Sequence, residues 1–353
     1  MKNKIIILCI ILSFFSLLYS KDLEMHDDYE QMIELSGRVN QAFEIIKEEK
    51  VSRGIVLNDE TGMLGAEYTG ITTTLGSLEA KATTLNPNFS SVIYNYLDEL
   101  NLNSGDEIAV NLSSSFPSLN IQVIMTLEKM GYEPVIISSV GASTYGATNP
   151  GFTYIDMEYI LYQNEIIHHK SLLVSPGGDD DLGLNMDPLL LDSIFLRLED
   201  YGYRTYIEPE YEKNLNERLL IYKDCKALIN VGGNYMSFTG NDIGYESSYG
   251  VIRATTSYNY NERGLIGAFL NNDKDVIHLL NIKGIALDNN LPIDPKGKIE
   301  IGSNGQFYEA KYSLVWLSVT LLLCIILILR VVYEKKKKIR KYIKTVVKQE
   351  LMD

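Results

Sequence analysis

Two long apolar runs stand at the ends of this chain, and the region between them alternates between helical and strand patterns. Residues 5–20 are almost wholly apolar and follow Lys2 and Lys4, which is typical of a secretory signal. Leu18 occupies a position where cleavage favours a small residue. Both a cleaved signal peptide and an uncleaved signal anchor therefore stay open for residues 1–20.

The second apolar run, residues 312–333, is long enough to cross a membrane, because about 20 helical residues span the hydrocarbon core. Trp316 lies near one end, where aromatic rings favour the membrane interface. Eight Lys and Arg residues follow in the segment 334–353. The positive-inside rule predicts a transmembrane helix with a basic cytoplasmic tail. The middle of the chain is then expected outside a bacterial cytoplasmic (inner) membrane.

The region between the two runs begins with a helical pattern and continues as an α/β pattern. Residues 27–50 carry apolar side chains at three- and four-residue steps, so we expect a juxtamembrane helical segment within 21–54. Beyond it we predict helices over 88–100, 119–130, 187–201 and 210–223, and strands over 107–112, 134–139, 172–175, 204–207, 227–231 and 275–282.

The succession of strand, loop, helix and strand predicts parallel pairing in this region. Ser118 is the expected N-cap of the helix over 119–130. The expected fold class is α/β, with mostly parallel sheet and flanking helices over 55–311. A boundary near 175 would divide this extracytoplasmic domain into possible lobes of 55–175 and 176–311.

Charge is divided unevenly between these parts. The formal net charge is -14, and the two ends carry +8 of it, so the region between them carries -22. An acidic region on the outer side of a membrane is a poor partner for nucleic acid, whose phosphates bind Lys and Arg. Cys225 is the one cysteine outside the apolar ends, and a buried structural thiol is the expectation for it.

Three loops are expected at one edge of the sheet, beyond the carboxyl ends of the strands, where ligands bind in open α/β sheets. Their small residues allow close approach to backbone N–H groups and suit an anion, although the same residues also form ordinary tight turns. The ligand-binding candidates are Ser113, Ser114, Ser115, Asn120, Ser138, Ser139, Gly141, Ser143, Gly232, Gly233 and Asn234.

Other chemistries find less support in the sequence. Glycine-rich nucleotide motifs are missing, so no cofactor is expected. Asp179, Asp180 and Asp181 lack the spacing of a calcium loop, and an exposed acidic loop is expected instead of a metal site. A serine nucleophile at the turn over 113–115 is conceivable, but the G-x-S-x-G motif is absent.

Several blocks of this sequence resemble the poly-gamma-glutamate system protein family. The resembling blocks are ETGMLGAEYTGITTTLGSLEAKATTLNPNF at 60–89, VNLSSSFPSLN at 110–120, PVIISSVGASTYGATNPGFTYIDME at 134–158, INVGGNYMSFTG at 229–240 and, more weakly, LLNIKGIALDNNLPIDP at 279–295. The motif residues outside the three loops are Glu67, Thr72, Thr73, Thr74, Glu79 and Lys81.

The resemblance implies a membrane-anchored accessory protein of bacterial poly-γ-glutamate synthesis, export or surface retention, at the cell surface in a capsule-forming system. Such a protein is expected to be non-catalytic and to bind membrane proteins of synthesis and export. The alternative is an extracytoplasmic hydrolase or transferase acting on the γ-glutamyl polymer, with Ser113 to Ser115 and Lys81 as first suspects. A region of -22 repels a polyanion, so direct polymer binding requires local positive pockets or bound cations.

Overall fold

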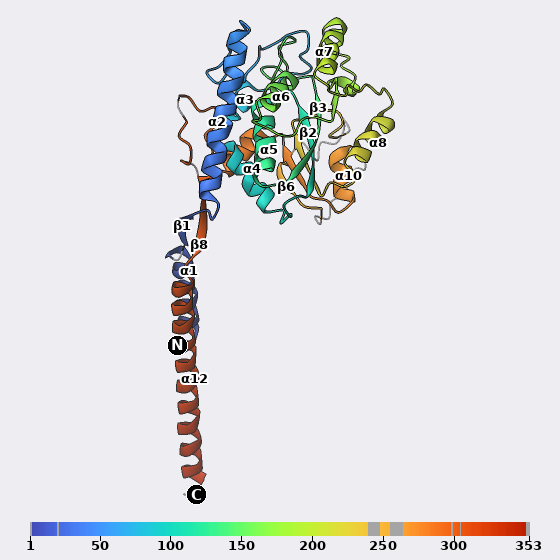
Figure 1. The fold of residues 1–353 in the computed structure, drawn as a ribbon. Coiled ribbons are helices and arrows are strands. Elements are labelled where there is room, and N and C mark those ends of the chain that lie inside the picture. The colour runs from blue at the N-terminus through green and yellow to red at the C-terminus, as the bar shows by residue number, and fades with distance from the viewer. Residues whose placement is uncertain are drawn as a thin grey trace. The chain divides into compact units, whose positions relative to one another are not determined.

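The computed structural model describes residues 2–19, 21–238, 248–254, 264–297, 299–303 and 305–350. The chain divides into two compact units (Figure 1). Unit 1 comprises residues 1–27 and 308–353, and unit 2 comprises residues 28–307.

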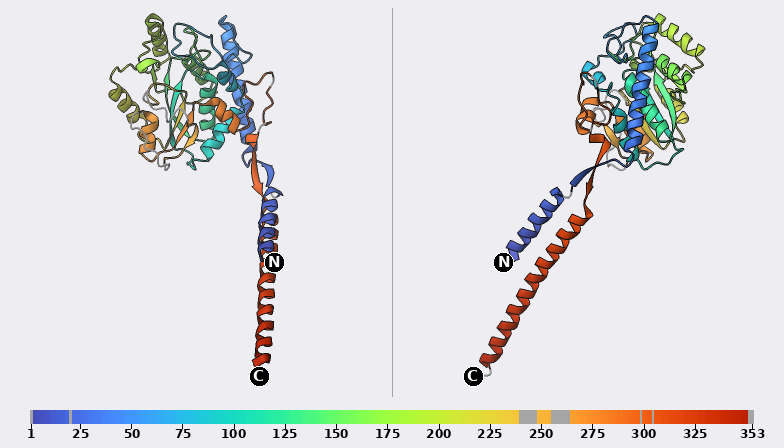
Figure 2. Two further views of the ribbon diagram at one scale, coloured as in Figure 1. Left: turned by 180° about the vertical axis from the view of Figure 1, so that it is seen from behind. Right: turned by 60° about the vertical axis from the view of Figure 1, so that its left-hand side comes forward.

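Unit 1 contains two long helices joined to a two-stranded ribbon in the described residues. Its elements are α1 (Lys2–Tyr19), β1 (Lys21–Met25), β8 (Tyr308–Tyr312) and α12 (Leu314–Glu350). β1 pairs with β8 antiparallel, with Lys21 opposite Tyr312. α1 and α12 leave this ribbon as separate helices (Figure 2). They meet where Thr320 Oγ1 donates to Ser16 Oγ at 2.8 Å.

Within the segment Leu314–Lys341 of α12, an 18-residue stretch reaches a mean hydropathy of 2.7, and the helix is long and apolar enough to cross a membrane. Of the described helices it alone meets both conditions, and the apolar stretch Ile5–Ser16 of α1 is shorter. The apolar run predicted over 312–333 therefore lies on a single helix from Leu314 onward, whereas Tyr312 ends β8. That helix continues through the basic tail to Glu350, because no Pro or Gly interrupts the sequence.

Unit 2 is built on a mostly parallel sheet, as the strand and helix pattern predicts. Six strands in the described part of the chain pair in the order β4-β3-β2-β5-β7-β6, and only β6 runs antiparallel to its neighbour. The strands are β2 (Glu107–Ser113), β3 (Glu133–Ser139), β4 (Leu173–Ser175), β5 (Ala227–Val231), β6 (Gly250–Ile252) and β7 (Val276–Leu279). Strands from both sides of residue 175 share this sheet, since β5 pairs with β2.

Helices cover both faces of the sheet, which explains why the strands are near-continuous apolar runs (Figures 1 and 2). One face carries α2 (Tyr29–Ser52), α4 (Phe89–Asp98), α5 (Pro117–Lys129) and α6 (Tyr154–Gln163), and the other carries α8 (Tyr211–Ile221) and α10 (Leu265–Asn271). The remaining helices are α3 (Leu78–Thr83), η1 (Asp179–Asp181), α7 (Pro188–Asp200), α11 (Ile282–Asp288) and η2 (Gly305–Phe307).

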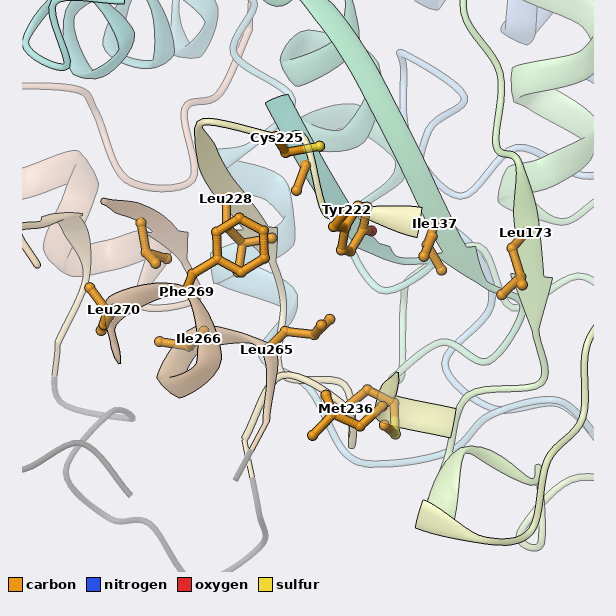
Figure 3. Packing of buried hydrophobic residues seen from close by; sticks show 13 residues of the cluster. Ile137, Leu173, Tyr222, Cys225, Leu228, Met236, Leu265, Ile266, Phe269 and Leu270 are labelled. Carbon is orange, nitrogen blue, oxygen red and sulfur yellow. The ribbon is translucent and has the colours of Figure 1, made fainter. Parts of the chain in front are cut away.

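The core on the α8 and α10 face shows how the strands meet these helices (Figure 3). Leu228 from β5 lies beside Phe269 of α10, and Tyr222 lies between Leu228 and Ile137 of β3. Cys225 belongs to this cluster, and burial raises the pKa of its thiol to about 12. The expectation of a buried structural cysteine is therefore confirmed.

Several sequence predictions differ from the structure at the ends of elements. Phe116 and not Ser118 is the N-cap of α5, because Pro117 takes the first helical position, which needs no N–H. Residues 204–207 form no strand; Thr205 makes an isolated bridge to Val174. The strand expected over 275–282 ends at Leu279.

Candidate functional site

The order of the strands reverses direction beside β2. The chain proceeds from β2 through β3 to β4, and then returns to the opposite side of β2 as β5. In open α/β sheets, ligands bind beyond the carboxyl ends of the strands at such a reversal. Ser113 ends β2, and Gly232 follows β5. A Cβ on Gly232 would lie 3.1 Å from the Cβ of Ser113, so the two predicted loops adjoin at this point.

Lys81 is the only cationic side chain among the predicted site residues, and the structure buries it at this edge. Ser77 caps the short helix α3 and positions Lys81 one turn later. The side chain is 2% exposed. Its Nζ lies 2.5 Å from the carbonyl oxygen of Ser115 and 2.8 Å from Ser143 Oγ. It also lies 4.2 Å from the ring centroid of Phe116.

Burial alone lowers the pKa of Lys81 to about 7, because desolvation penalises the ammonium form. Both protonation states are therefore populated near neutral pH. The ammonium form donates to Ser115 and Ser143. The neutral amine keeps the donor to the Ser115 carbonyl and offers its lone pair to the Ser143 hydroxyl. This arrangement allows proton transfer from a serine to a lysine, as general base catalysis requires.

Three serines extend the polar group around Lys81. The backbone N–H of Ser143 donates to Ser115 Oγ at 3.0 Å. Ser113 Oγ donates to Ser115 Oγ at 2.9 Å, and it accepts from the Ser115 N–H. Ser115 and Ser143 are 9% and 8% exposed, respectively, so the hydroxyl groups lie just below the surface. We call Lys81, Ser113, Ser115 and Ser143 the serine–lysine cluster.

Glycines let the neighbouring segments pack closely against this cluster. A Cβ on Gly76 would lie 2.8 Å from Ser143 Oγ and 3.1 Å from Lys81 Cε. A Cβ on Gly146 would lie 2.9 Å from the Cα of Ser115. A side chain at either position would therefore press on a member of the cluster, and only glycine lets these segments approach.

A second polar group lies on the adjoining strands. Asn111 of β2, Asn230 of β5 and His278 of β7 stand opposite one another across the sheet. Asn111 Nδ2 donates to Asn230 Oδ1 at 2.7 Å and to Asn234 Oδ1 at 3.2 Å. Ser237 Oγ lies 2.7 Å from Asn230 Oδ1 and 2.8 Å from Asn234 Oδ1, and its single proton serves one of these two acceptors. Asn234, one of the predicted ligand-binding residues, is therefore hydrogen-bonded to Asn111 of β2.

His278 completes this group as a neutral ring. Burial lowers its pKa to about 4. The Asn230 amide lies 3.1 Å from Nδ1. Asn230 Oδ1 already accepts from Asn111, so Nδ2 faces the ring and Nδ1 is the acceptor. Nε2 then carries the proton.

Six further predicted residues hold the loops in place. Asn120 Nδ2 donates to the Ser113 carbonyl, and Ser114 Oγ donates to the carbonyl of Ser139, which is itself a predicted residue. Ser138 pairs with Ser171. Gly141 packs against Thr73, where a Cβ would lie 2.5 Å from its methyl group. Gly233 lies beside Phe238 and Leu280.

The remaining motif residues support the segment that carries Lys81. Thr72 Oγ1 accepts from the Thr69 N–H, and the Thr73 N–H donates to the Ala142 carbonyl. The Thr74 carbonyl accepts from Thr144. Glu67 is exposed and bonds the Tyr145 hydroxyl, which raises the pKa of that tyrosine. Glu79 forms an ion pair with Lys283.

The aspartate triplet differs from the expected exposed loop. Asp179 and Asp180 are exposed, but Asp181 is 1% exposed. Its carboxylate lies 2.6 Å from Nη2 of Arg218, which is equally buried. Ser175 and Asn214 also donate to Asp181. This pair could not be predicted from the local sequence, because the arginine lies 37 residues later in the chain.

Within the described residues no group of three or more His, Cys, Asp and Glu side chains could hold a metal ion.

The group of Asn111, Asn230 and His278 was not predicted from the sequence. The available signal was an asparagine inside each of two apolar strands, IAVNLS and ALINV, whose parallel register places the two side by side.

Searches of family models, of curated proteins and of solved structures found no match to this chain.

Proposed function

We propose that this chain is a membrane-anchored protein of poly-γ-glutamate synthesis, export or retention, and that its α/β unit acts on γ-glutamyl amide bonds. Lys81 is the general base and Ser143 the nucleophile. One observation carries this proposal. The amine of Lys81, with its pKa near neutral, lies 2.8 Å from a serine hydroxyl at the edge of an open α/β sheet where the strand order reverses. This favours the catalytic alternative over a non-catalytic accessory role.

The chemistry follows from the two side chains. Neutral Lys81 takes the proton from Ser143 Oγ as that oxygen attacks the carbonyl carbon of a γ-amide bond. The C–N bond then breaks, and the ammonium of Lys81 protonates the departing amine. The γ-glutamyl group remains on Ser143 as an ester. Water or a second amine then attacks the ester with Lys81 again as the base, which gives hydrolysis or transfer.

The link to a γ-glutamyl polymer is supported by the resembling blocks. Lys81 comes from the block 60–89, Ser113 and Ser115 from 110–120, and Ser143 from 134–158. Hydrogen bonds join these three blocks at a single point. Residues that are far apart in sequence and belong to the distinctive blocks thus make up the serine–lysine cluster.

The proposed location follows from α12 and the charge of its flank. The basic segment after the span favours the cytoplasmic side, and unit 2 is then extracytoplasmic. A cysteine placed at Glu48, an exposed position in unit 2, should react with a membrane-impermeant maleimide in intact cells, whereas one at Lys337 should react only after lysis. The background is a chain in which Cys9, Cys225 and Cys324 are replaced by Ser or Ala. Labelling at Lys337 in intact cells would contradict this topology.

The activity is tested with the purified full-length chain in nanodiscs and poly-γ-glutamate, with chain length followed by size-exclusion chromatography. Wild-type protein should shorten the polymer or join labelled amine acceptors to it. Ser143→Ala and Lys81→Met should each lose at least ~100-fold in rate, the scale of general base catalysis. Ser91→Ala is the matched control, because Ser91 is also buried but its hydroxyl donates to the Asn88 carbonyl at the start of its own helix. Activity that survives Ser143→Ala would exclude this mechanism.

A result without any bond cleavage would favour the non-catalytic candidate. In that case Lys81 would act as a structural cation that joins the Ser115 and Ser143 segments, an arrangement that the same hydrogen bonds allow. The chain would then bind membrane proteins of the synthesis and export system, or the polymer through cations. Deletion of its gene should still reduce or mislocalise the polymer.

A further inference from the structure

A separate groove of about 430 Å³ lies beside the serine–lysine cluster and plays no part in the chemistry above. Two of the resembling blocks line it, through residues 64–66 and through Asn149 and Pro150. The end of α2 and the turn after it line the rest, with Lys50 from the helix. None of the described residues that line this groove is an Asp or a Glu. That is unusual in an acidic region of -22, and it leaves Lys50 as its dominant charge.

The side chain of Lys50 is buried, and a hydrogen bond fixes its position. The side chain is 3% exposed, and its Nζ donates to the Gly62 carbonyl at 2.6 Å. An ammonium group has three donors, so two remain after this bond. The nearby Asp59 carboxylate accepts from the Thr61 and Leu64 N–H groups and fixes the turn that presents Gly62. Burial lowers the pKa of Lys50 to about 8, against a smaller effect of Asp59.

The groove adjoins the serine–lysine cluster through one packed segment. The Gly65 N–H donates to the Tyr145 carbonyl, and the Tyr145 N–H donates to the Ala66 carbonyl. Gly146, the next residue, packs directly on Ser115. Residues that line the groove are therefore in backbone contact with the segment that carries Ser143.

We propose that this groove binds the free carboxylate of a γ-linked glutamate unit through Lys50. Every unit of such a chain has one carboxylate outside the amide backbone, and a buried ammonium is the side chain that pairs with it. The groove would hold one unit while a neighbouring amide bond reaches Ser143. This assignment rests on the proposed function for the identity of the ligand. It also explains how a polyanion could bind to an acidic region that should repel it, because the polymer then contacts a local cation.

The test measures binding without cleavage. Full-length Ser143→Ala protein in nanodiscs is titrated calorimetrically with a hexamer of γ-linked glutamate. Adding Lys50→Met should raise Kd at least ~10-fold, because a charge-assisted hydrogen bond is lost. Lys223→Met is the control, since Lys223 is exposed at the amino-terminal edge of the sheet and should leave Kd unchanged. An unchanged Kd in a folded Lys50→Met protein would overturn the proposal.

A second variant keeps the proposal testable if Lys50→Met fails to fold. Asn149 Oδ1 accepts from the Gly151 N–H, and Asn149→Asp keeps this acceptor while adding a negative charge to the groove. Kd for the hexamer should again rise, and a Kd equal to that of the parent protein would count against a carboxylate site. Inorganic phosphate that binds as tightly as the hexamer would also overturn it. If the hexamer binds in a Lys50-dependent way but the wild-type protein cleaves no polymer, the carboxylate site in the groove is supported and the proposed catalysis is rejected.

Discussion

The amine of Lys81 and the hydroxyl of Ser143 lie 2.8 Å apart, although 62 residues separate them in the chain. Only the deprotonated amine can accept the serine proton. Because burial lowers the pKa of Lys81 to about 7, the rate of polymer cleavage should rise with pH and level off above about 7. Initial rates between pH 5 and 9 provide the measurement.

An exposed lysine in the same role would instead give a rate that keeps rising toward its ordinary pKa of 10.5. A profile of that kind would place the base elsewhere. Lys213→Met serves as the control, because it removes an exposed lysine that pairs with Glu210 next to α8 and should leave the profile unchanged.

The buried pair of Asp181 and Arg218 should matter for stability. Asp181→Asn leaves the guanidinium of Arg218 without its countercharge in a site that excludes water. Breaking such a pair lowers the free energy of unfolding by roughly 3–5 kcal/mol. Urea unfolding followed by circular dichroism measures this loss. In contrast, Glu217→Gln removes the partner of the exposed Arg204, where a loss of at most ~1 kcal/mol is expected.

His278 should make the folded protein sensitive to acid. Its pKa falls from 6.5 to about 4 on folding, so between these values the unfolded chain binds a proton that the folded chain does not. The free energy of unfolding should therefore decrease as pH falls through this window, by at most ~1.4 kcal/mol per pH unit. His278→Gln should reduce this slope. His168→Gln, at an exposed position, should leave the slope unchanged. An equal reduction of the slope in both variants would argue against His278 as its source.

Gly65 and Gly37 form a matched pair for a packing test. A Cβ on Gly65 would lie 2.0 Å from the Gly146 carbonyl oxygen, so Gly65→Ala must move the segment that carries Ser143. We expect a loss of roughly 1–3 kcal/mol in the free energy of unfolding and a lower rate of cleavage. On Gly37, in α2, a Cβ would meet no atom within 4 Å. Gly37→Ala should stabilise the protein by roughly 0.5–1 kcal/mol through helix propensity. Thermal unfolding compares the two variants.

The parallel sheet was predictable because its strands are local apolar runs between clear turn residues. β2, β3 and β5 lie within one or two residues of the predicted ranges. Short elements were not predictable in this way. α3 has six residues and β6 has three, too few to show a period, and tertiary contacts determine them.

The candidate site was predictable only in part. The three loops follow from the rule that ligands bind beyond the carboxyl ends of parallel strands. The sequence does not show that Lys81 reaches Ser143, because this contact depends on how residues 72–74 pack against residues 142–144. The pairing of Asp181 with Arg218 likewise depends on tertiary structure, since the sequence near the triplet does not indicate a buried cation.

The ends of the two units have a consequence for how such a chain can change. Within unit 2 the ring of Tyr29, near its beginning, lies 6.0 Å from that of Phe307, at its end. Within unit 1 the strands that lead in and out pair with each other residue by residue. A unit whose entry and exit points are neighbours is an insertable cassette. The paired strands and helices of unit 1 can therefore carry a different globular unit, exchanged by evolution or by an engineer at residues 28 and 307.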